Sequence, residues 1–122
     1  MQLSMMYAKI HRAVVTHSEL HYNGSMGVDR DILDAASLLP GQRIDVLNVN
    51  TGARFSTYLI EEPRGSKHFG VYGAAAHLAK QGEIIIIIAY AQMTPEEAKT
   101  YQSKTLIMDK DNNIVEALPH NV

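Results

Sequence analysis

The segment Ile84–Ile88 is a run of five consecutive isoleucines, and it restricts the possible fold more than any other part of the chain. β-Branched side chains are favoured in strands, and an unbroken apolar run suits a strand that is buried on both faces. The longer apolar stretch 84–91 is too short to cross a bilayer as a helix. We therefore predict a buried strand over residues 84–88.

Other strands are predicted where apolar residues alternate with polar ones, or where a short apolar segment lies between turn residues. From Met6 to Val14 the even positions are apolar, with Arg12 as the exception. Asn50-Thr51-Gly52 is a turn that should join two strands into a hairpin. Besides 84–88, the predicted strands are 6–14, 43–49, 54–60, 68–72 and 104–108.

Short helices are predicted from capping residues and from apolar side chains at helical spacing. Asp29 is a good N-cap, and Pro40-Gly41 should end the helix that it opens. Thr94-Pro95-Glu96-Glu97 is a capping box with proline at the first helical position. Gly73–Ala79 indicates a tight turn into a short helix, which Gly82 closes. Two or three short helices among six or seven strands favour a mainly-β fold, a small β-barrel.

The 122 residues form one domain, which is small for an independent enzyme. Small domains often build buried sites between subunits, so an oligomer is plausible. The net charge of −2 gives no basic footprint for nucleic acid, and the N-terminus lacks the long apolar region of a signal peptide. Without cysteine there is no disulfide, thiolate zinc site or thiol nucleophile. We expect a cytoplasmic protein that binds neither nucleic acid nor membrane.

The bond between Gly24 and Ser25 could carry chemistry. A serine hydroxyl can attack the carbonyl carbon of its preceding peptide bond, and glycine tolerates the positive φ that this attack needs. β-Elimination of the resulting ester leaves dehydroalanine, and hydrolysis then leaves a pyruvoyl group, whose carbonyl could act as an electron sink. Asn-Gly is also the strongest short hairpin signal, so these residues taken alone favour a tight turn at Asn23-Gly24.

A second Gly-Ser bond, Gly65-Ser66, lies in the segment 61–67 beside Pro63. This segment has the composition of an exposed, solvated loop. A self-processing bond must be held strained by the structure around it, and we expect this loop to be mobile. The segment therefore argues against Gly65-Ser66 as a processed bond.

Arg54, Ser56 and Tyr58 alternate along a predicted strand and therefore share one face. A guanidinium and a phenol on one face can bind a carboxylate and deliver a proton, but an ordinary polar outer face has the same pattern. Lys9 and His11 form a similar pair on the first strand.

Two further groupings have ordinary structural explanations. His17 and His21 lie four residues apart, but no third metal ligand is evident, so a plain histidine pair is favoured over a metal site. Gly73-Ala74-Ala75-Ala76 would bring bare backbone N–H groups close to a ligand, or would simply allow tight packing.

Five motifs occur together in a fixed order along the chain. They are Lys9-Ile10-His11-Arg12, His21-Tyr22-x-Gly24-Ser25, Leu33-Asp34-Ala35-Ala36, Arg54-Phe55-Ser56-Thr57-Tyr58 and Gly73-Ala74-Ala75-Ala76-His77. In this order and spacing the sequence resembles the aspartate 1-decarboxylase family, from about residue 5 to about residue 97. That family consists of pyruvoyl-dependent enzymes that convert L-aspartate to β-alanine and carbon dioxide for pantothenate synthesis.

The resemblance implies a double-psi β-barrel, a homotetramer and a proenzyme that is cut between Gly24 and Ser25. A single decarboxylase domain would then consist of the two pieces 1–24 and 25–122. The cofactor would be a covalent pyruvoyl group formed from Ser25, and no metal is implied.

The resemblance also assigns roles to individual residues. Tyr58 would donate the proton that replaces the lost carboxylate. The substrate contacts would be Thr57, Gly73, Ala74 and Ala75, and the retained carboxylate would be bound by Arg54 and Lys9. Tyr72 departs from the family pattern, because asparagine is common before the Gly-Ala-Ala run. Leu47 and Met26 also differ from the residues that are frequent at their positions.

Two other functions remain as alternatives at this point. The first is a non-catalytic small barrel that binds a ligand or partner, in which Ser25 is never processed. The second is a related pyruvoyl decarboxylase that acts on another amino acid, such as glutamate.

Overall fold

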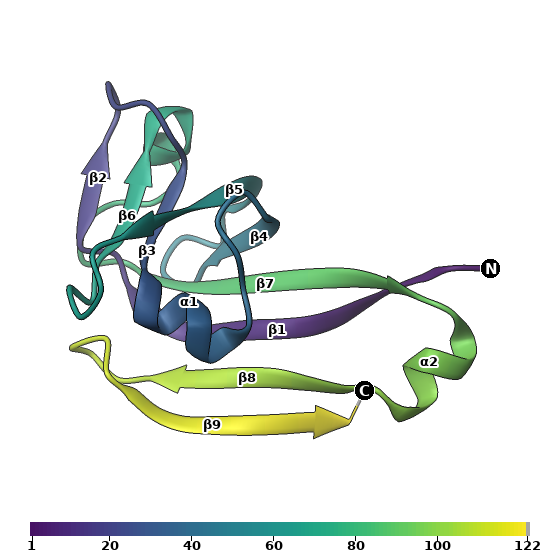
Figure 1. The fold of residues 1–122 in the computed structure, drawn as a ribbon. Coiled ribbons are helices and arrows are strands. Elements are labelled where there is room, and N and C mark those ends of the chain that lie inside the picture. Colours follow the sequence, from purple (N-terminus) through teal and green to yellow (C-terminus); the bar gives the residue numbers. More distant parts are fainter. Residues whose placement is uncertain (122) are drawn as a thin grey trace.

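The chain is built mainly from strands. The computed structural model describes residues 1–121, and over these it has nine strands, two α-helices and one 3₁₀ helix (Figure 1). In chain order the elements are β1 (Leu3–Val14), β2 (His17–Glu19), β3 (Met26–Asp29), α1 (Arg30–Ala36), β4 (Arg43–Asn48), β5 (Arg54–Glu62), β6 (Phe69–Tyr72), the 3₁₀ helix η1 (Gly73–His77), β7 (Ile84–Met93), α2 (Pro95–Thr100), β8 (Gln102–Met108) and β9 (Ile114–Asn121).

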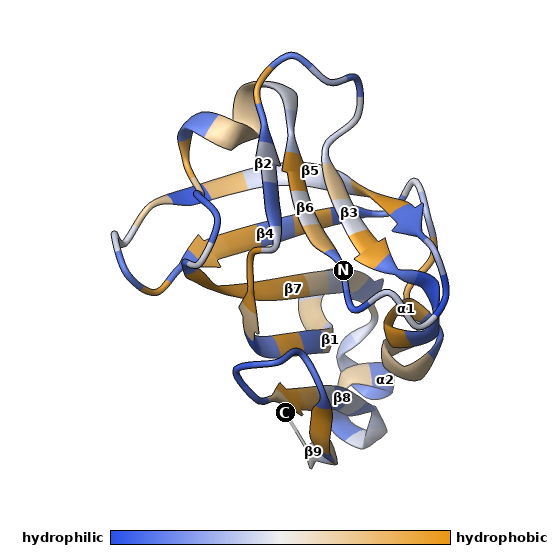
Figure 2. Ribbon diagram, turned by 90° about the vertical axis from the view of Figure 1, so that its left-hand side faces the viewer, coloured by the Kyte–Doolittle hydropathy of each residue, from blue (hydrophilic) through white to orange (hydrophobic). Residues whose placement is uncertain are grey.

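The strands follow the order β2-β6-β3-β5-β4-β7-β1-β8-β9. The pairs β1/β8, β2/β6 and β3/β5 are parallel, whereas the other neighbours are antiparallel. Figure 2 shows β2, β6 and β3 running across the direction of β4 and β7, so the sheet curls around its own apolar side. This arrangement confirms the predicted fold class, a small, mainly-β, barrel-like domain.

The isoleucine run lies at the centre of the sheet, where β7 pairs with β1 on one side and β4 on the other. Ile85 and Ile87 are fully buried in the core. Ile84, Ile86 and Ile88 are only half-buried because they point to the opposite face. The predicted strand is therefore confirmed, but in this chain its burial is complete on one face only.

The exception at Arg12 in the alternation of β1 has a structural cause. The pairing of β1 with β7 shifts register between His11 and Ala13, and Arg12 adopts a φ of 68°. One extra residue at a β-bulge reverses which positions face the core. Ile10 and Ala13 are both fully buried for this reason, although their numbers differ in parity.

Asp29 organises the joint between β3, α1 and the loop that follows β5. Its buried carboxylate accepts hydrogen bonds from the backbone N–H groups of Asp31, Gly65 and Lys67, at 2.8, 3.1 and 2.8 Å. The predicted N-cap is confirmed. The predicted exposed loop begins at residue 63 and not at 61, because residues 61 and 62 belong to β5, and Asp29 binds its backbone at Gly65 and Lys67.

Several predicted boundaries also need correction. α1 ends at Ala36, where Ser37 takes a left-handed conformation, and not at Pro40-Gly41. The 3₁₀ helix ends at His77 rather than near Gly82. The capping box at Thr94 is confirmed. Among the strands, β2, β3 and β9 were not predicted. Within residues 1–121, no helix is long and apolar enough to cross a membrane.

Candidate active site

The Gly24-Ser25 bond lies in the connection between β2 and β3, in surroundings that require glycine. Gly24 has a φ of 120°, a conformation that residues with a Cβ rarely adopt. A Cβ placed on Gly24 would also lie 3.0 Å from Cδ1 of Ile60 on β5. Ser25 itself is 5% exposed. The bond is therefore crowded, shielded from water and held in a conformation reserved for glycine.

The start of η1 fixes the other side of this bond. The backbone N–H of Tyr72 donates to the carbonyl oxygen of Ser25 at 2.7 Å. Gly73 follows with a φ of 72°, and a Cβ at this position would lie 3.3 Å from the carbonyl oxygen of Gly24. Tyr72 and Gly73 thus contact the carbonyl groups on both sides of the Ser25 nitrogen and Cα.

Gly65-Ser66 offers a contrast within the same chain. Gly65 also has a positive φ, 78°, but a Cβ placed there would meet nothing within 4 Å. The hydroxyl of Ser66 accepts a hydrogen bond from the backbone N–H of His68 at 3.3 Å. Gly65 is exposed, Ser66 is half-buried and the bond between them is uncrowded, so the structure distinguishes the two Gly-Ser bonds by their packing.

Arg54, Ser56 and Tyr58 share one face of β5, as their alternation predicts. The hydroxyl of Ser56 donates to Asp45 on β4 at 2.6 Å, which confirms that this face continues across the sheet. Tyr58 is 45% exposed. Thr57 points to the opposite face and is half-buried.

The face that carries Arg54 and Tyr58 extends over four strands, because directly paired residues point the same way. One row runs across β5, β4, β7 and β1 through Arg54, Leu47, Ile86 and His11, and the next runs through Ser56, Asp45, Ile88 and Lys9. We call this surface the outer sheet face; it consists of Lys9, His11, Arg43, Asp45, Leu47, Arg54, Ser56, Tyr58, Ile86, Ile88 and Tyr90.

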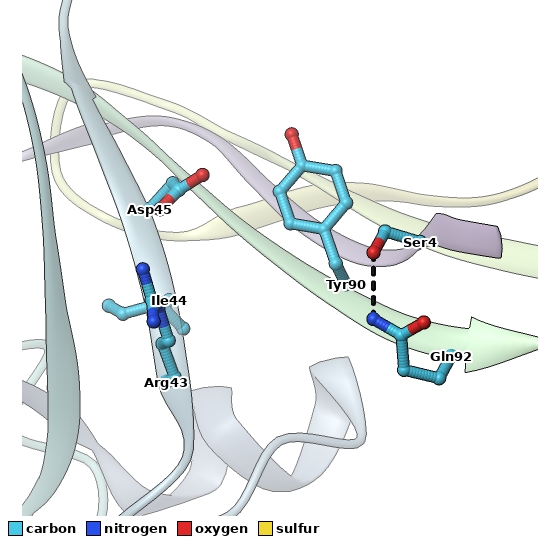
Figure 3. A pocket seen from close by; sticks show the side chains of 6 residues that line it. All are labelled: Ser4, Arg43, Ile44, Asp45, Tyr90 and Gln92. Atoms are coloured by element: carbon cyan, nitrogen blue, oxygen red, sulfur yellow. Dashed lines mark hydrogen bonds between the residues drawn. The ribbon is translucent and has the colours of Figure 1, made fainter. Parts of the chain in front are cut away.

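Three hollows open on or beside the outer sheet face. The largest, about 440 Å³, lies between Arg43 and Asp45 on one side and Gln92 and Ser4 on the other, with Tyr90 standing between them (Figure 3). A neighbouring cavity of about 180 Å³ shares Asp45 and Tyr90 with it and contains Arg54, Ser56, Leu47 and Phe55. A third, of about 270 Å³, contains Lys9 and His11 with Met6, Thr105, Ile107 and Leu118. Ser25 lines none of the three.

The candidate site residues therefore fall into two groups. Gly24, Ser25 and Gly73 are in contact, and exposed Ala74 and half-buried Ala75 follow directly in η1. Thr57 lies two residues before Leu59, the β5 partner of Met26 in the parallel pairing of β3 with β5. The second group consists of Lys9, Arg54 and Tyr58 on the outer sheet face.

His11 is a candidate that the sequence analysis only paired with Lys9 and gave no role. Its Nδ1 atom and the hydroxyl of Thr105 are buried without a hydrogen-bond partner in residues 1–121. Burial lowers the pKa of His11, and the positive charges of Lys9 and Arg12 lower that pKa further. An unpartnered polar pair beside a lysine in a cavity is suited to binding a polar ligand.

Tyr72 lines a fourth cavity, of about 310 Å³, with Tyr22, Asn23, Ile60 and others. Its hydroxyl donates to Oε2 of Glu62 at 3.0 Å. Burial raises the pKa of Tyr72 to about 12, with the Glu62 carboxylate as the next cause. The sequence analysis singled out Tyr72 but missed Glu62, because nothing in the sequence indicates that the two residues meet.

His17 contacts Thr16 and His68 in this structure. The Nδ1 atom of His17 is 2.8 Å from the hydroxyl of Thr16, and its ring packs edge-on against His68 with 4.5 Å between centroids. Within residues 1–121 no three histidine, cysteine, aspartate or glutamate side chains are grouped so that they could hold a metal ion.

Known proteins resemble this chain over nearly all of its length. The family model for aspartate decarboxylase matches residues 1–115. A relative named aspartate 1-decarboxylase from Maricaulis maris is 50% identical over 115 residues, which cover 94% of this chain and 95% of the relative. Relatives of the same name from Caulobacter vibrioides and Thermoanaerobacter pseudethanolicus are each 50% identical, over 96% and 94% of this chain and 99% and 98% of their own length. The chain therefore belongs to the aspartate decarboxylase family.

Proposed function

We propose that this chain is a pyruvoyl-dependent decarboxylase that converts L-aspartate to β-alanine after cutting its own Gly24-Ser25 bond. The observation that carries the proposal is the packing of this bond between Ile60, Tyr72 and Gly73. Family membership supports the substrate and the reaction, and the local geometry supports the processing step.

The processing step begins when the Ser25 hydroxyl attacks the carbonyl carbon of Gly24. The C–N bond breaks, the nitrogen takes up the hydroxyl proton, and an ester joins the two residues. Loss of the Ser25 α-proton then breaks the bond between Cβ and the ester oxygen, which frees the Gly24 carboxylate. Water finally replaces nitrogen as ammonia and leaves a pyruvoyl group at residue 25. The burial of Ser25 supports this sequence, because excluding water disfavours simple hydrolysis of the ester.

The pyruvoyl group supplies a carbonyl that accepts the electron pair released as carbon dioxide leaves. Around it we assign Thr57 and Gly73–Ala75 to contact the substrate. Arg54 and Lys9 bind the retained carboxylate, because guanidinium and ammonium groups form strong charge-assisted hydrogen bonds with carboxylates. The Tyr58 hydroxyl protonates the former α-carbon.

A second copy of the chain must complete this site. Arg54 points to the outer sheet face, whereas Ser25 is buried beside Tyr72 and lines none of the hollows on that face. We infer that Arg54 binds a substrate that reacts at Ser25 of another copy and not of its own chain. We therefore propose a homo-oligomer, with a tetramer expected from the family, in which the outer sheet face of one copy covers the Gly24-Ser25 region of another.

Intact mass spectrometry of freshly purified protein tests the processing step. The wild-type chain should give two pieces, 1–24 and 25–122, and the larger piece should resist Edman sequencing because its terminus is a ketone. Ser25→Ala should stay whole and make no β-alanine from aspartate. Ser66→Ala is the matched control and should be cut normally.

The substrate is tested by assaying the processed protein with aspartate and, separately, with glutamate. Turnover of aspartate alone is the expected result. A wild-type chain that remains whole would contradict the proposal, as would cleavage of Ser25→Ala at this bond.

A further inference from the structure

Gly27 on β3 and Gly70 on β6 are directly paired across the sheet. Neither has a positive φ, so the backbone alone would accept alanine at both positions. A Cβ on Gly27 would lie closer than 3.0 Å to the carboxylate of Glu62, and a Cβ on Gly70 would come as close to the hydroxyl of Tyr72. Real Cβ atoms essentially never show such separations. Gly27 and Gly70 therefore leave a space on the sheet that their own side chains do not occupy, and the side chains of Glu62 and Tyr72 fill it. We call the surface formed by Gly27 and Gly70 the bare floor.

Glu62 and Tyr72 lie on this floor and hold each other. The hydroxyl of Tyr72 donates to Oε2 of Glu62 at 3.0 Å, and Oε1 of Glu62 lies 3.2 Å from Nδ1 of His68. The side chain of Glu62 is only 15% exposed, so its hydrogen bonds are shielded from water. The pair joins the last residue of β5 to the last residue of β6.

This anchor lies next to the bond that we propose is cut. The backbone N–H of Tyr72 is the donor to the Ser25 carbonyl, and Gly73 packs against the Gly24 carbonyl. A hydrogen bond at the end of the Tyr72 side chain thus restricts the backbone that positions both carbonyls. The phenol itself is occupied by Glu62, and its raised pKa keeps it protonated at neutral pH, so it is not a base for the Ser25 hydroxyl.

We propose that Glu62 is a positioning residue for self-processing: packed over Gly27 and Gly70, it anchors Tyr72 so that the backbone around Ser25 is held for attack of the Ser25 hydroxyl on the Gly24 carbonyl carbon. The inference rests on the proposed self-cleavage. It also gives a reason for the tyrosine at position 72, where the family pattern commonly has asparagine, because Glu62 and the bare floor accommodate the larger side chain.

The first experiment follows cleavage of newly synthesised chains over time on denaturing gels. Glu62→Ala and Tyr72→Phe each remove the hydrogen bond and should slow cleavage by about tenfold or more, the effect of losing one shielded hydrogen bond to a charged group. Glu62→Gln keeps an oxygen that accepts from the phenol and should recover most of the rate. Recovery by glutamine separates positioning from simple packing, since glutamine and glutamate fill the same space.

The second experiment tests the bare floor. Gly70→Ala should displace the phenol and slow cleavage about as much as Tyr72→Phe. In a Tyr72→Asn background the phenol is absent, so adding Gly70→Ala should change the rate little further. The stability of each variant is measured by unfolding it in the Ser25→Ala background, where every chain stays whole. A loss of stability can then be told apart from a slower cleavage reaction.

The outcomes distinguish this inference from the proposed function. If the wild-type chain is never cut, self-processing itself is wrong. If the wild type is cut and Glu62→Ala is cut at the same rate, or if Glu62→Gln is as slow as Glu62→Ala, the positioning role of Glu62 is wrong while self-processing stands.

Discussion

Tyr58 and Thr57 are adjacent in the sequence, yet their side chains lie on opposite sides of the sheet. In a strand, consecutive side chains point to opposite faces, so Thr57 is directed to the curled side and Tyr58 to the outer sheet face. A role for both residues in one reaction therefore requires that the two faces meet, and in this fold that needs two copies of the chain.

Tyr58→Phe should separate proton donation from packing. Tyr58 is half-exposed and the substitution retains its ring, so folding and cleavage at Gly24-Ser25 should be normal. Loss of the donated proton should reduce turnover of aspartate by about 10²–10⁴-fold. The assay is β-alanine formation by protein whose processing has been verified by mass. Normal turnover in the processed variant would exclude Tyr58 as the donor.

Individual residues show what the sequence could and could not predict. The shared face of Arg54 and Tyr58 follows from strand periodicity. Dipeptide chemistry marks Gly24-Ser25 as a candidate bond, but only the resemblance to the family assigns it as the bond that is cut. The packing of Tyr72 over Gly70 could not be predicted, because a glycine in a strand does not indicate which distant side chain fills the space beside it. The proximity of His11 to Thr105 likewise depends on the parallel pairing of β1 with β8.

At the scale of elements, one buried carboxylate fixes three segments. Asp29 is 2% exposed, caps α1 and holds two backbone N–H groups of the loop after β5. The sequence predicts the cap, because aspartate before an apolar helical stripe is a recognised signal. It cannot predict the loop contacts, since these residues lie 36 and 38 positions away.

Asp29→Ala should lower the free energy of unfolding by about 2–4 kcal/mol, since it removes a helix cap and the buried carboxylate that accepts from three backbone N–H groups. Thr94→Ala removes the exposed cap of α2 and should cost only about 1 kcal/mol. Urea denaturation of both variants in the Ser25→Ala background provides the comparison. Equal losses would show that the loop contacts of Asp29 contribute nothing measurable.

The strands that the sequence missed share a physical reason. β2 and β3 have only three and four residues, too few for a period of two to be recognised. β9 presents mostly exposed side chains over residues 114–117, so its apolar pattern is weak. The long strands β1 and β5 show alternation because one of their faces is buried, and β7 was predicted instead from its unbroken isoleucine run.

For the whole molecule, the division of the site between two faces predicts complementation. Ser25→Ala should lack the proposed pyruvoyl group but retain Arg54, whereas Arg54→Ala should be processed but lack the proposed carboxylate-binding residue. Each should be nearly inactive alone. Co-expressed chains should regain activity, because a mixed assembly brings Arg54 of one copy to residue 25 of the other. A mixture as inactive as its separate parents would contradict a shared site.

The position of β1 has a consequence for refolding of the protein after the proposed cleavage. β1 belongs to residues 1–24, yet it lies between β7 and β8 and contributes Ala8, Ile10 and Ala13 to the core. The proposed cleavage would therefore turn a fold of one chain into a complex of two, held only by pairing and packing. A short tether provides an effective concentration near 1 mM, so at about 1 µM protein its loss costs about 4 kcal/mol of refolding free energy.

Processed protein that is unfolded in urea and then diluted should recover poorly, and an excess of synthetic 1–24 peptide should restore the yield. The uncut Ser25→Ala chain should refold without the peptide. Processing would then act as an irreversible step: an uncut chain can refold after unfolding, whereas each unfolding of the cut protein separates it from β1, one of its interior strands.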